Sequence, residues 1–367
     1  MKKTLWMLGV AVAALTSCTE SEVVDVPESR VIGFDQFVGN NTRAEVNNTT
    51  LKNIWVFGYS KEANADEYSE KEFENVHVYY AEANDERAAA GWAYDDLQYW
   101  KRNTDYRFAA YANGVEETSS LQIENVNADN YVKYNPNDDT DVNADDGDQI
   151  NFINYTTDGS HDLVASISGD KNVGDDLPAY QVSFNFNHLL SKVVIRLASV
   201  TSATFKVKKI EILNAYNKGN CKYDFIDAAT VPEREWDLTG NTQEVAYTLL
   251  NNANAPTVLT STMTDVAVGY VIPQPNAGIN LRITIETFDS DDESVHERVF
   301  EGSMTTKISD ELTYTNNNWE PAFVYTYIYQ FGVNHDEKPI EFNVNNIGGF
   351  TAAGQNAIEL NMEENLD

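Results

Sequence analysis

Arg43 is the first residue whose setting suggests chemistry on the chain itself. It stands in the run Gly-Asn-Asn-Thr-Arg-Ala, directly after the alternating segment "VIGFDQFV" at 31–38. Runs rich in Gly and Asn favour exposed turns, and an exposed turn with a basic side chain is open to proteolytic nicking. The bond between Arg43 and Ala44 is therefore a candidate cleavage site. The alternative is that Arg43 is an ordinary loop residue.

Cys18 stands at the end of an N-terminal processing signal. "MKK" is a cationic start, "TLWMLGVAVAA" is a short apolar run, and "LTSC" closes the signal. This order resembles a bacterial lipobox, in which the chain is cut before the cysteine and its sulfur receives a diacylglycerol. We expect a signal peptide at 1–17 and a lipidated acidic tether at 18–29, which holds the protein to the membrane. The alternatives are a secretory signal that happens to contain a cysteine, or a short membrane anchor.

Other candidate chemistry is weak. The five histidines stand far apart, and the sequence holds no nucleophile elbow, P-loop or dinucleotide fingerprint, so we expect no enzyme and no cofactor. Asp141, Asn143 and Asp145 alternate as calcium ligands do. However, the nearby Gly147 is one place too late for an EF-hand and no Glu follows at position 12, so a solvated acidic loop is favoured over a metal site.

The charge balance excludes one class of partner. The 367 residues include 25 Lys and Arg against 58 Asp and Glu, which gives a net charge of −33. A phosphate backbone binds to cationic surfaces, so we expect no nucleic acid partner. The 42% of hydrophobic residues is enough to build packed cores. Cys221, the second cysteine, is expected to be a small core residue.

Almost every apolar segment after residue 30 has strand character. "NIWVFGY" at 53–59 is apolar on both faces, which predicts a buried strand. Similar segments occur at 106–112, 180–188, 192–200, 208–216, 266–273, 279–288 and 324–333. Many strands joined by loops rich in Asn, Asp and Gly predict an all-β chain of β-sandwiches. The stretch at 135–149 is interpreted as a solvated acidic loop, and a second polar break at 168–180 precedes a dense run of strands. We place the domain boundary at this second break, near 178, between an N-terminal sandwich at 30–178 and a C-terminal sandwich at 179–367.

Three strands have side-chain patterns that matter for function. Ile32, Phe34 and Val38 would share one face of the first strand, and Ile358, Leu360 and Met362 would share one face of "NAIELNME" at 356–363. These patterns are similar enough for one strand to replace the other. Alternatively, each is an edge strand of its own domain. The aromatic stripe within 325–331 is either a core face or a platform for sugar stacking, and the core is favoured.

Several dispersed motifs resemble one known family. They are the lipobox, "VIGFDQFVGNNTRAE", "IWVFGY", "GWAYDDLQYWKRNTDYRFAAYA", "HDLVAS" with "VSFNFNHLLSKVVIRL", "VIPQ", and "WEPAFVYTYIYQFGV". Together they are similar to the fimbrillin family of Bacteroidales, the Mfa-like or type V pilin-like surface lipoproteins. The resemblance covers nearly all of the mature chain.

The resemblance implies a function as well as a fold. It implies two tandem transthyretin-like β-sandwich domains on a lipid-anchored precursor at the outer membrane. In the family, an arginine-specific protease cuts at the T-R-A site, here Arg43, the N-terminal strand leaves, and a strand of the next subunit fills the groove. We therefore expect a structural subunit of a surface fimbria, with other fimbrial subunits as partners and a role in adhesion. The alternative is a monomeric outer-membrane lipoprotein that binds glycans or another surface ligand.

Overall fold

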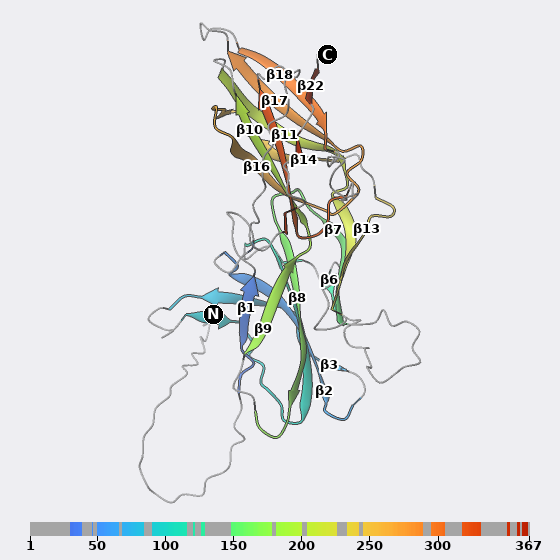
Figure 1. The fold of residues 1–367 in the computed structure, drawn as a ribbon. Coiled ribbons are helices and arrows are strands. Elements are labelled where there is room, and N and C mark those ends of the chain that lie inside the picture. Colours follow the sequence, from blue (N-terminus) through green and yellow to red (C-terminus); the bar gives the residue numbers. More distant parts are fainter. Residues whose placement is uncertain are drawn as a thin grey trace, which may run out of the picture.

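The protein is all-β. The computed structural model describes residues 30–38, 46, 50–65, 68–83, 90–115, 120–121, 126–128, 148–177, 181–199, 204–225, 233–241, 245–288, 295–304, 318–331, 351–352, 358–359 and 362–365. All regular elements in these ranges are strands (Figure 1), and none of the described residues forms a helix that could cross a membrane. The expected fold class is confirmed.

Two sheets form the first sandwich, which is the lower part of Figure 1. The seven-stranded sheet has the order β1-β9-β8-β5-β2-β3-β4, and the four-stranded sheet has the order β13-β12-β7-β6. The strands of the larger sheet are β1 (Phe34–Val38), β2 (Asn53–Glu62), β3 (Glu70–Ala81), β4 (Gly91–Ala93), β5 (Thr104–Asn113), β8 (Leu163–Val173) and β9 (Val182–His188). Those of the smaller sheet are β6 (Val126–Asn127), β7 (Asp148–Thr156), β12 (Lys218–Phe225) and β13 (Glu233–Asp237).

Strand β2 shows why the larger sheet has two buried faces. Trp55 and Phe57 face a core that also contains Phe152 of β7, between the two sheets. Ile54 and Val56 face the opposite way, into a second core that the curled larger sheet encloses. A strand that is covered on both faces needs apolar residues at successive positions, which confirms the expectation for this segment.

The second sandwich, in the upper part of Figure 1, contains the remaining strands. In one sheet the order is β16-β10-β19-β20, with β21 also paired to β19; in the other it is β14-β11-β17-β18-β22, with β15 paired to β11. The first sheet contains β10 (Ser191–Ser199), β16 (Thr264–Val271), β19 (Phe323–Phe331), β20 (Thr351–Ala352) and β21 (Ile358–Glu359). The second contains β11 (Thr204–Ala215), β14 (Val245–Asn251), β15 (Thr257–Val258), β17 (Asn280–Phe288), β18 (Val295–Ser303) and β22 (Met362–Asn365).

The aromatic stripe of β19 lies in the core of the second sandwich. Tyr325, Tyr327, Tyr329 and Phe331 are all buried, and they pack with apolar residues of β10, β11 and β17. The core interpretation of this stripe is confirmed, because buried rings cannot present a face to a sugar.

The chain crosses between the two sandwiches more than once. Strand β9 follows residue 178 but pairs with β8 and β1 in the first sandwich. After β10 and β11 the chain returns, because β12 pairs with β7. A cut near 178 would therefore separate strands of one sheet, and the two-domain division at that residue stays a prediction. Loop composition marks where the chain meets solvent, whereas the sheet that the next strand joins is set by distant partners.

Candidate functional site

The segment that contains β1 is held first by β9. The two strands run parallel, with Phe34 opposite Val182 and Val38 opposite Phe186. The amide of Val182 also donates to the carbonyl oxygen of Gly33 at 2.7 Å. Strand β1 is the last strand in the order of its sheet, so no other strand of that sheet pairs with its other side.

The same segment is held on its other side by residues that follow β4. The amide of Ile32 donates to the carbonyl oxygen of Gln98, and the amide of Trp100 donates to that of Arg30, both at 2.9 Å. These bonds flank an antiparallel bridge between Val31 and Tyr99. Residues 30–38 thus link β9 of the curled seven-stranded sheet to the segment that follows its far edge strand, β4.

A buried tyrosine hydroxyl adds a further bond at this point. Tyr94 donates its hydroxyl proton to the carbonyl oxygen of Ile32 at 2.9 Å and accepts a bond from the amide of Gln98 at 3.2 Å. Burial raises the pKa of Tyr94 from 10.0 to about 12. The hydroxyl therefore keeps its proton near neutral pH and remains a donor to the β1 segment.

Phe34 fills a pocket of four aromatic rings. Its ring centroid lies 5.3 Å from that of Phe73, 5.6 Å from Tyr94, 6.0 Å from Phe108 and 5.9 Å from Phe184. Ring pairs in proteins favour separations of this size, mostly edge-to-face as in three of these four pairs. The Phe34 side chain is 2% exposed and Ile32 is 0% exposed. We call β9, residues 94–100 and these four rings the β1 seat.

Gly58 of β2 makes room for two of those rings. A Cβ atom at this position would lie 2.7 Å from Phe73 Cδ2 and 2.9 Å from Phe108 Cδ1, which is closer than real contacts allow. A glycine inside a strand often marks such a close approach. The ring pocket was not predicted from the sequence, and a glycine inside a buried strand is the local signal that could have indicated it. Tyr94 and Trp100 have no such local signal.

Arg43 and Ala44, which form the expected cleavage site, lie outside the described residues. The structure describes its two flanks. On one side, β1 ends at Val38; on the other, Val46 is 1% exposed and lies in the same core as Phe34. The candidate bond therefore stands between two parts of the chain that are packed in one core.

The C-terminal candidate strand is divided between two sheets. Ile358 belongs to β21 and is paired in parallel with Tyr327 of β19, while Met362 begins β22 and is paired with Gly302 of β18. Leu360 lies outside the described residues. Cys18 and the alternating Asp141, Asn143 and Asp145 also lie outside them.

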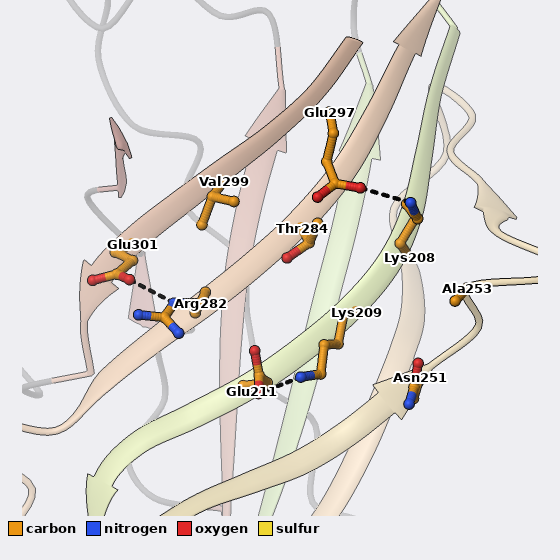
Figure 2. A pocket seen from close by; sticks show the side chains of 10 residues that line it. All are labelled: Lys208, Lys209, Glu211, Asn251, Ala253, Arg282, Thr284, Glu297, Val299 and Glu301. Atoms are coloured by element: carbon orange, nitrogen blue, oxygen red, sulfur yellow. Dashed lines mark hydrogen bonds and ion pairs between the residues drawn. The ribbon is translucent and has the colours of Figure 1, made fainter. Parts of the chain in front are cut away.

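The outer face of the β14-β11-β17-β18 sheet offers a pocket for the alternative of ligand binding (Figure 2). A register shift between Val207 and Lys209 in β11 allows Lys208 and Lys209 to line the same hollow, which has a volume of about 440 Å³. The charged groups are already paired: Lys208 with Glu297, Lys209 with Glu211, and Arg282 with Glu301, each at 2.6 Å. No aromatic residue lines it. A sugar would find no ring to stack on and would have to compete with these ion pairs.

The described residues also contain no arrangement typical of a hydrolase. Ser160 Oγ lies 2.5 Å from Asp158 Oδ1 and 2.6 Å from His161 Nδ1, so both groups contact the serine and the aspartate does not orient the histidine. His188 and Asp162 form a pair at 2.6 Å but are buried. Cys221 is free and 2% exposed, and burial raises the pKa of its thiol, as expected for a core residue. No group of three metal-binding side chains occurs in the described part of the chain.

Comparisons with known proteins give one strong match and several distant ones. The family described as fimbrillin-like matches residues 42–346. No protein of curated function matches the chain. Among solved structures, a candidate cell adhesion protein of Bacteroides uniformis ATCC 8492 is 13% identical with a TM-score of 0.45, covering 91% of this chain and 97% of that chain. A candidate cell adhesion protein of Bacteroides fragilis NCTC 9343 is 11% identical with a TM-score of 0.40, covering 92% and 98%.

A fimbrial assembly protein of Parabacteroides distasonis ATCC 8503 is 13% identical with a TM-score of 0.33, covering 74% of this chain and 85% of that chain. Likenesses this distant carry no argument about function. The family match is different, because it spans most of the 367 residues. The chain therefore belongs to the fimbrillin-like family, a family of cell-surface adhesion proteins and not of enzymes.

Proposed function

We propose that this protein is a structural subunit of a surface fimbria, assembled by strand exchange at the β1 seat. It is anchored in the outer membrane through a lipid on Cys18 until an arginine-specific protease cuts between Arg43 and Ala44. The segment that contains β1 then leaves, and the C-terminal strand of another subunit takes its place. The observation that carries this proposal is the construction of the β1 seat.

The seat has the properties that a replaceable strand requires. Ile32 and Phe34 are fully buried, and burying a large apolar side chain contributes about 1.5–3 kcal/mol. Loss of the strand would expose the rings of Phe73, Phe108 and Phe184 to water, which disfavours an empty seat. A new strand with apolar residues at alternate positions would recover that free energy.

The proposed donor lies far from the seat of its own chain. Strand β22 pairs with β18 in the second sandwich, at the top of Figure 1, whereas β1 pairs with β9 in the first sandwich, lower in the picture. A strand that contains Ile358, Leu360 and Met362 would therefore serve another subunit. Head-to-tail contacts of this kind build a filament wherever the rotation between subunits does not close a ring. The donor must first give up its pairing with β19 and β18.

An engineered disulfide that reversibly holds the departing strand in place tests the proposal. Val31 and Tyr99 are 40% and 39% exposed, and they form the close, non-hydrogen-bonded type of antiparallel pair, whose Cα separation of about 4.5 Å suits a disulfide. The variant Val31→Cys/Tyr99→Cys, made with Cys18→Ser, can be oxidised to hold the strand in place. Buried Cys221 will not compete.

After trypsin cuts at Arg43, verified by N-terminal sequencing, the oxidised variant should stay monomeric in light scattering. Addition of dithiothreitol should start the growth of high-mass species. The two single-cysteine variants, which cannot lock, are the matched controls and should assemble in both conditions. Equal assembly of the oxidised and reduced double variant would overturn the proposal, and so would a cut, reduced subunit that remains monodisperse at high concentration.

A further inference from the structure

We propose that a hollow between β3 and residues 95–98 binds an arginine side chain of a partner protein. The partner is a basic, extended segment that carries an apolar residue next to the arginine. This inference goes beyond the proposed function, because it concerns what the protein binds on its outer surface and requires no exchange of strands.

The hollow is formed where the chain leaves β4 and continues beside β3. It has a volume of about 330 Å³. Ligand pockets span about 300–1,000 Å³, so this one is at the small end and suits a single long side chain. Its lining residues are Glu72, Phe73, Val76, His77 and Tyr79 of β3, and Asp95, Asp96 and Gln98 after β4.

Two carboxylates in the lining have no internal cation. Glu72 is paired with Lys101 and accepts a bond from the hydroxyl of Ser60 at 2.6 Å. Asp95 and Asp96 are exposed, and neither side chain forms an ion pair or hydrogen bond with another described residue. No described Lys or Arg lines the hollow. The hollow therefore carries net negative charge, which favours a cationic occupant.

Two rings in the lining favour a guanidinium group over an ammonium group. The ring centroids of His77 and Tyr79 lie 5.4 Å apart. The His77 ring is held by stacking on Trp55 and by a hydrogen bond between its Nε2 and Asn53 Oδ1 at 2.9 Å. Tyr79 remains partly exposed. A planar guanidinium can stack on an aromatic ring and also donate two bonds to a carboxylate, whereas an ammonium group lacks this flat shape.

The protein itself contains an arginine in such a setting. The Cζ atom of Arg107 lies 4.3 Å from the ring centroid of Tyr68. The same guanidinium donates to both carboxylate oxygens of Asp170, at 2.5 and 3.2 Å. The hollow combines the same two groups, a tyrosine ring and aspartate carboxylates, on the outer surface.

Leu97 gives the partner a second, apolar contact. It is 37% exposed and stands between Asp96 and Gln98, which both line the hollow. Five large apolar residues of the described chain are exposed, and Leu97 and Tyr99 are two of them. An apolar residue beside the arginine of the partner would cover this surface.

Fluorescence anisotropy with three labelled peptides tests the inference on the uncut full chain with Cys18→Ser. The peptides read Ser-Gly-Leu-X-Ser-Gly, with arginine, lysine or citrulline at X. Citrulline has nearly the shape of arginine but no charge. At low ionic strength the arginine peptide should bind about tenfold tighter than the citrulline peptide and also tighter than the lysine peptide. Added salt should weaken it. Equal affinity for arginine and citrulline, or no binding of any peptide, would overturn the inference.

A matched pair of variants separates the hollow from the general negative charge of the chain. Asp95→Asn/Asp96→Asn should abolish the preference for arginine over citrulline. The control is Asp175→Asn/Asp176→Asn, because residues 175–177 have the same Asp-Asp-Leu order, and both aspartates are exposed but do not line the hollow. This control loses the same two charges and should keep the preference. Equal losses in the two double variants would overturn the inference, since they would show attraction to the whole acidic surface.

Discussion

The two ends of the described chain are held in very different ways. Near the N-terminus, residues 30–32 bond residues 98–100 on one side, and residues 33–38 pair with β9 on the other. The Ile32 and Phe34 side chains are buried in one core. Near the C-terminus, β20 and β21 have two residues each and pair with one strand, β19, while β22 has four residues and pairs with β18. The first arrangement combines an edge strand of five residues with a second set of main-chain bonds and a buried ring pocket, and the second is a series of shorter edge contacts.

This difference indicates why only one end would need a protease. A strand that pairs with β9, bonds residues 98–100 and fills a ring pocket should stay bound while it remains covalently attached, because a tethered strand rebinds at high effective concentration. Short edge pairings expose their main chain more readily and open at lower free energy. The comparison leads to four predictions, arranged from the largest expected effect to the smallest.

The largest effect is expected from the ring pocket. Phe34→Ala should lower the free energy of unfolding by about 3–5 kcal/mol, because it leaves a cavity among four rings. The C-terminal counterpart Ile358→Ala should cost less than about 1 kcal/mol if β21 is a weak edge contact. Urea unfolding followed by tryptophan fluorescence measures both. Equal costs for the two variants would break the comparison.

The second prediction concerns the space behind the pocket. Gly58→Ala should cost about 1–3 kcal/mol, because the new methyl group pushes against Phe73 and Phe108. Gly91→Ala is the matched control: Gly91 lies in β4, where nothing stands within 4 Å of an added Cβ atom. Its stability should change by no more than about 0.5 kcal/mol. If Gly58→Ala is equally neutral, the rings are less tightly placed than the structure indicates.

The third prediction isolates the hydroxyl that holds the β1 segment. Tyr94→Phe should cost about 1–2 kcal/mol, since the buried carbonyl of Ile32 and amide of Gln98 lose a partner. It should also speed hydrogen exchange at the amide of Ile32 more than at amides of β17 in the second sandwich. A uniform change across both sandwiches would mean that the bond supports the whole fold and not the seat.

The smallest effect is a change of stability with pH. The pKa of Tyr94 rises from 10.0 to about 12 on folding, so its contribution is complete below pH 10 and is lost between pH 10 and 12, where the unfolded chain gives up the proton first. At pH 11 the loss from this group is about 1 kcal/mol. The alkaline loss should therefore be smaller by that amount in Tyr94→Phe than in the unchanged protein. Identical alkaline profiles would contradict the burial of this hydroxyl.

Much of the fold could be predicted from local patterns. The doubly apolar pattern of β2 predicts a strand covered on both faces. Strand β9 was grouped with it, but its burial alternates, with Val182, Phe184 and Phe186 buried, as the alternation of its residues could have indicated. The aromatic stripe of β19 was interpreted correctly as a core face. These are properties of neighbouring residues, so no knowledge of the distant chain is needed.

The partners of the strands could not be predicted in the same way. Alternation in β9 says which side chains are buried, but not that β9 joins β8 and β1 and leaves the next strands to the second sandwich. The pocket of Phe34 combines Phe73, Tyr94, Phe108 and Phe184 from four separate segments. No local pattern relates such distant residues.

By itself, the sequence determined the all-β class, the buried faces of the strands and the apolar pattern of residues 31–38. Only the tertiary structure decided that this segment pairs with β9 and has residues 98–100 as its second partner. The physical reason is that side-chain alternation is set by the two-residue repeat of a strand. Pairing depends on which edges remain free once all the other strands have packed, and that is a property of the whole chain.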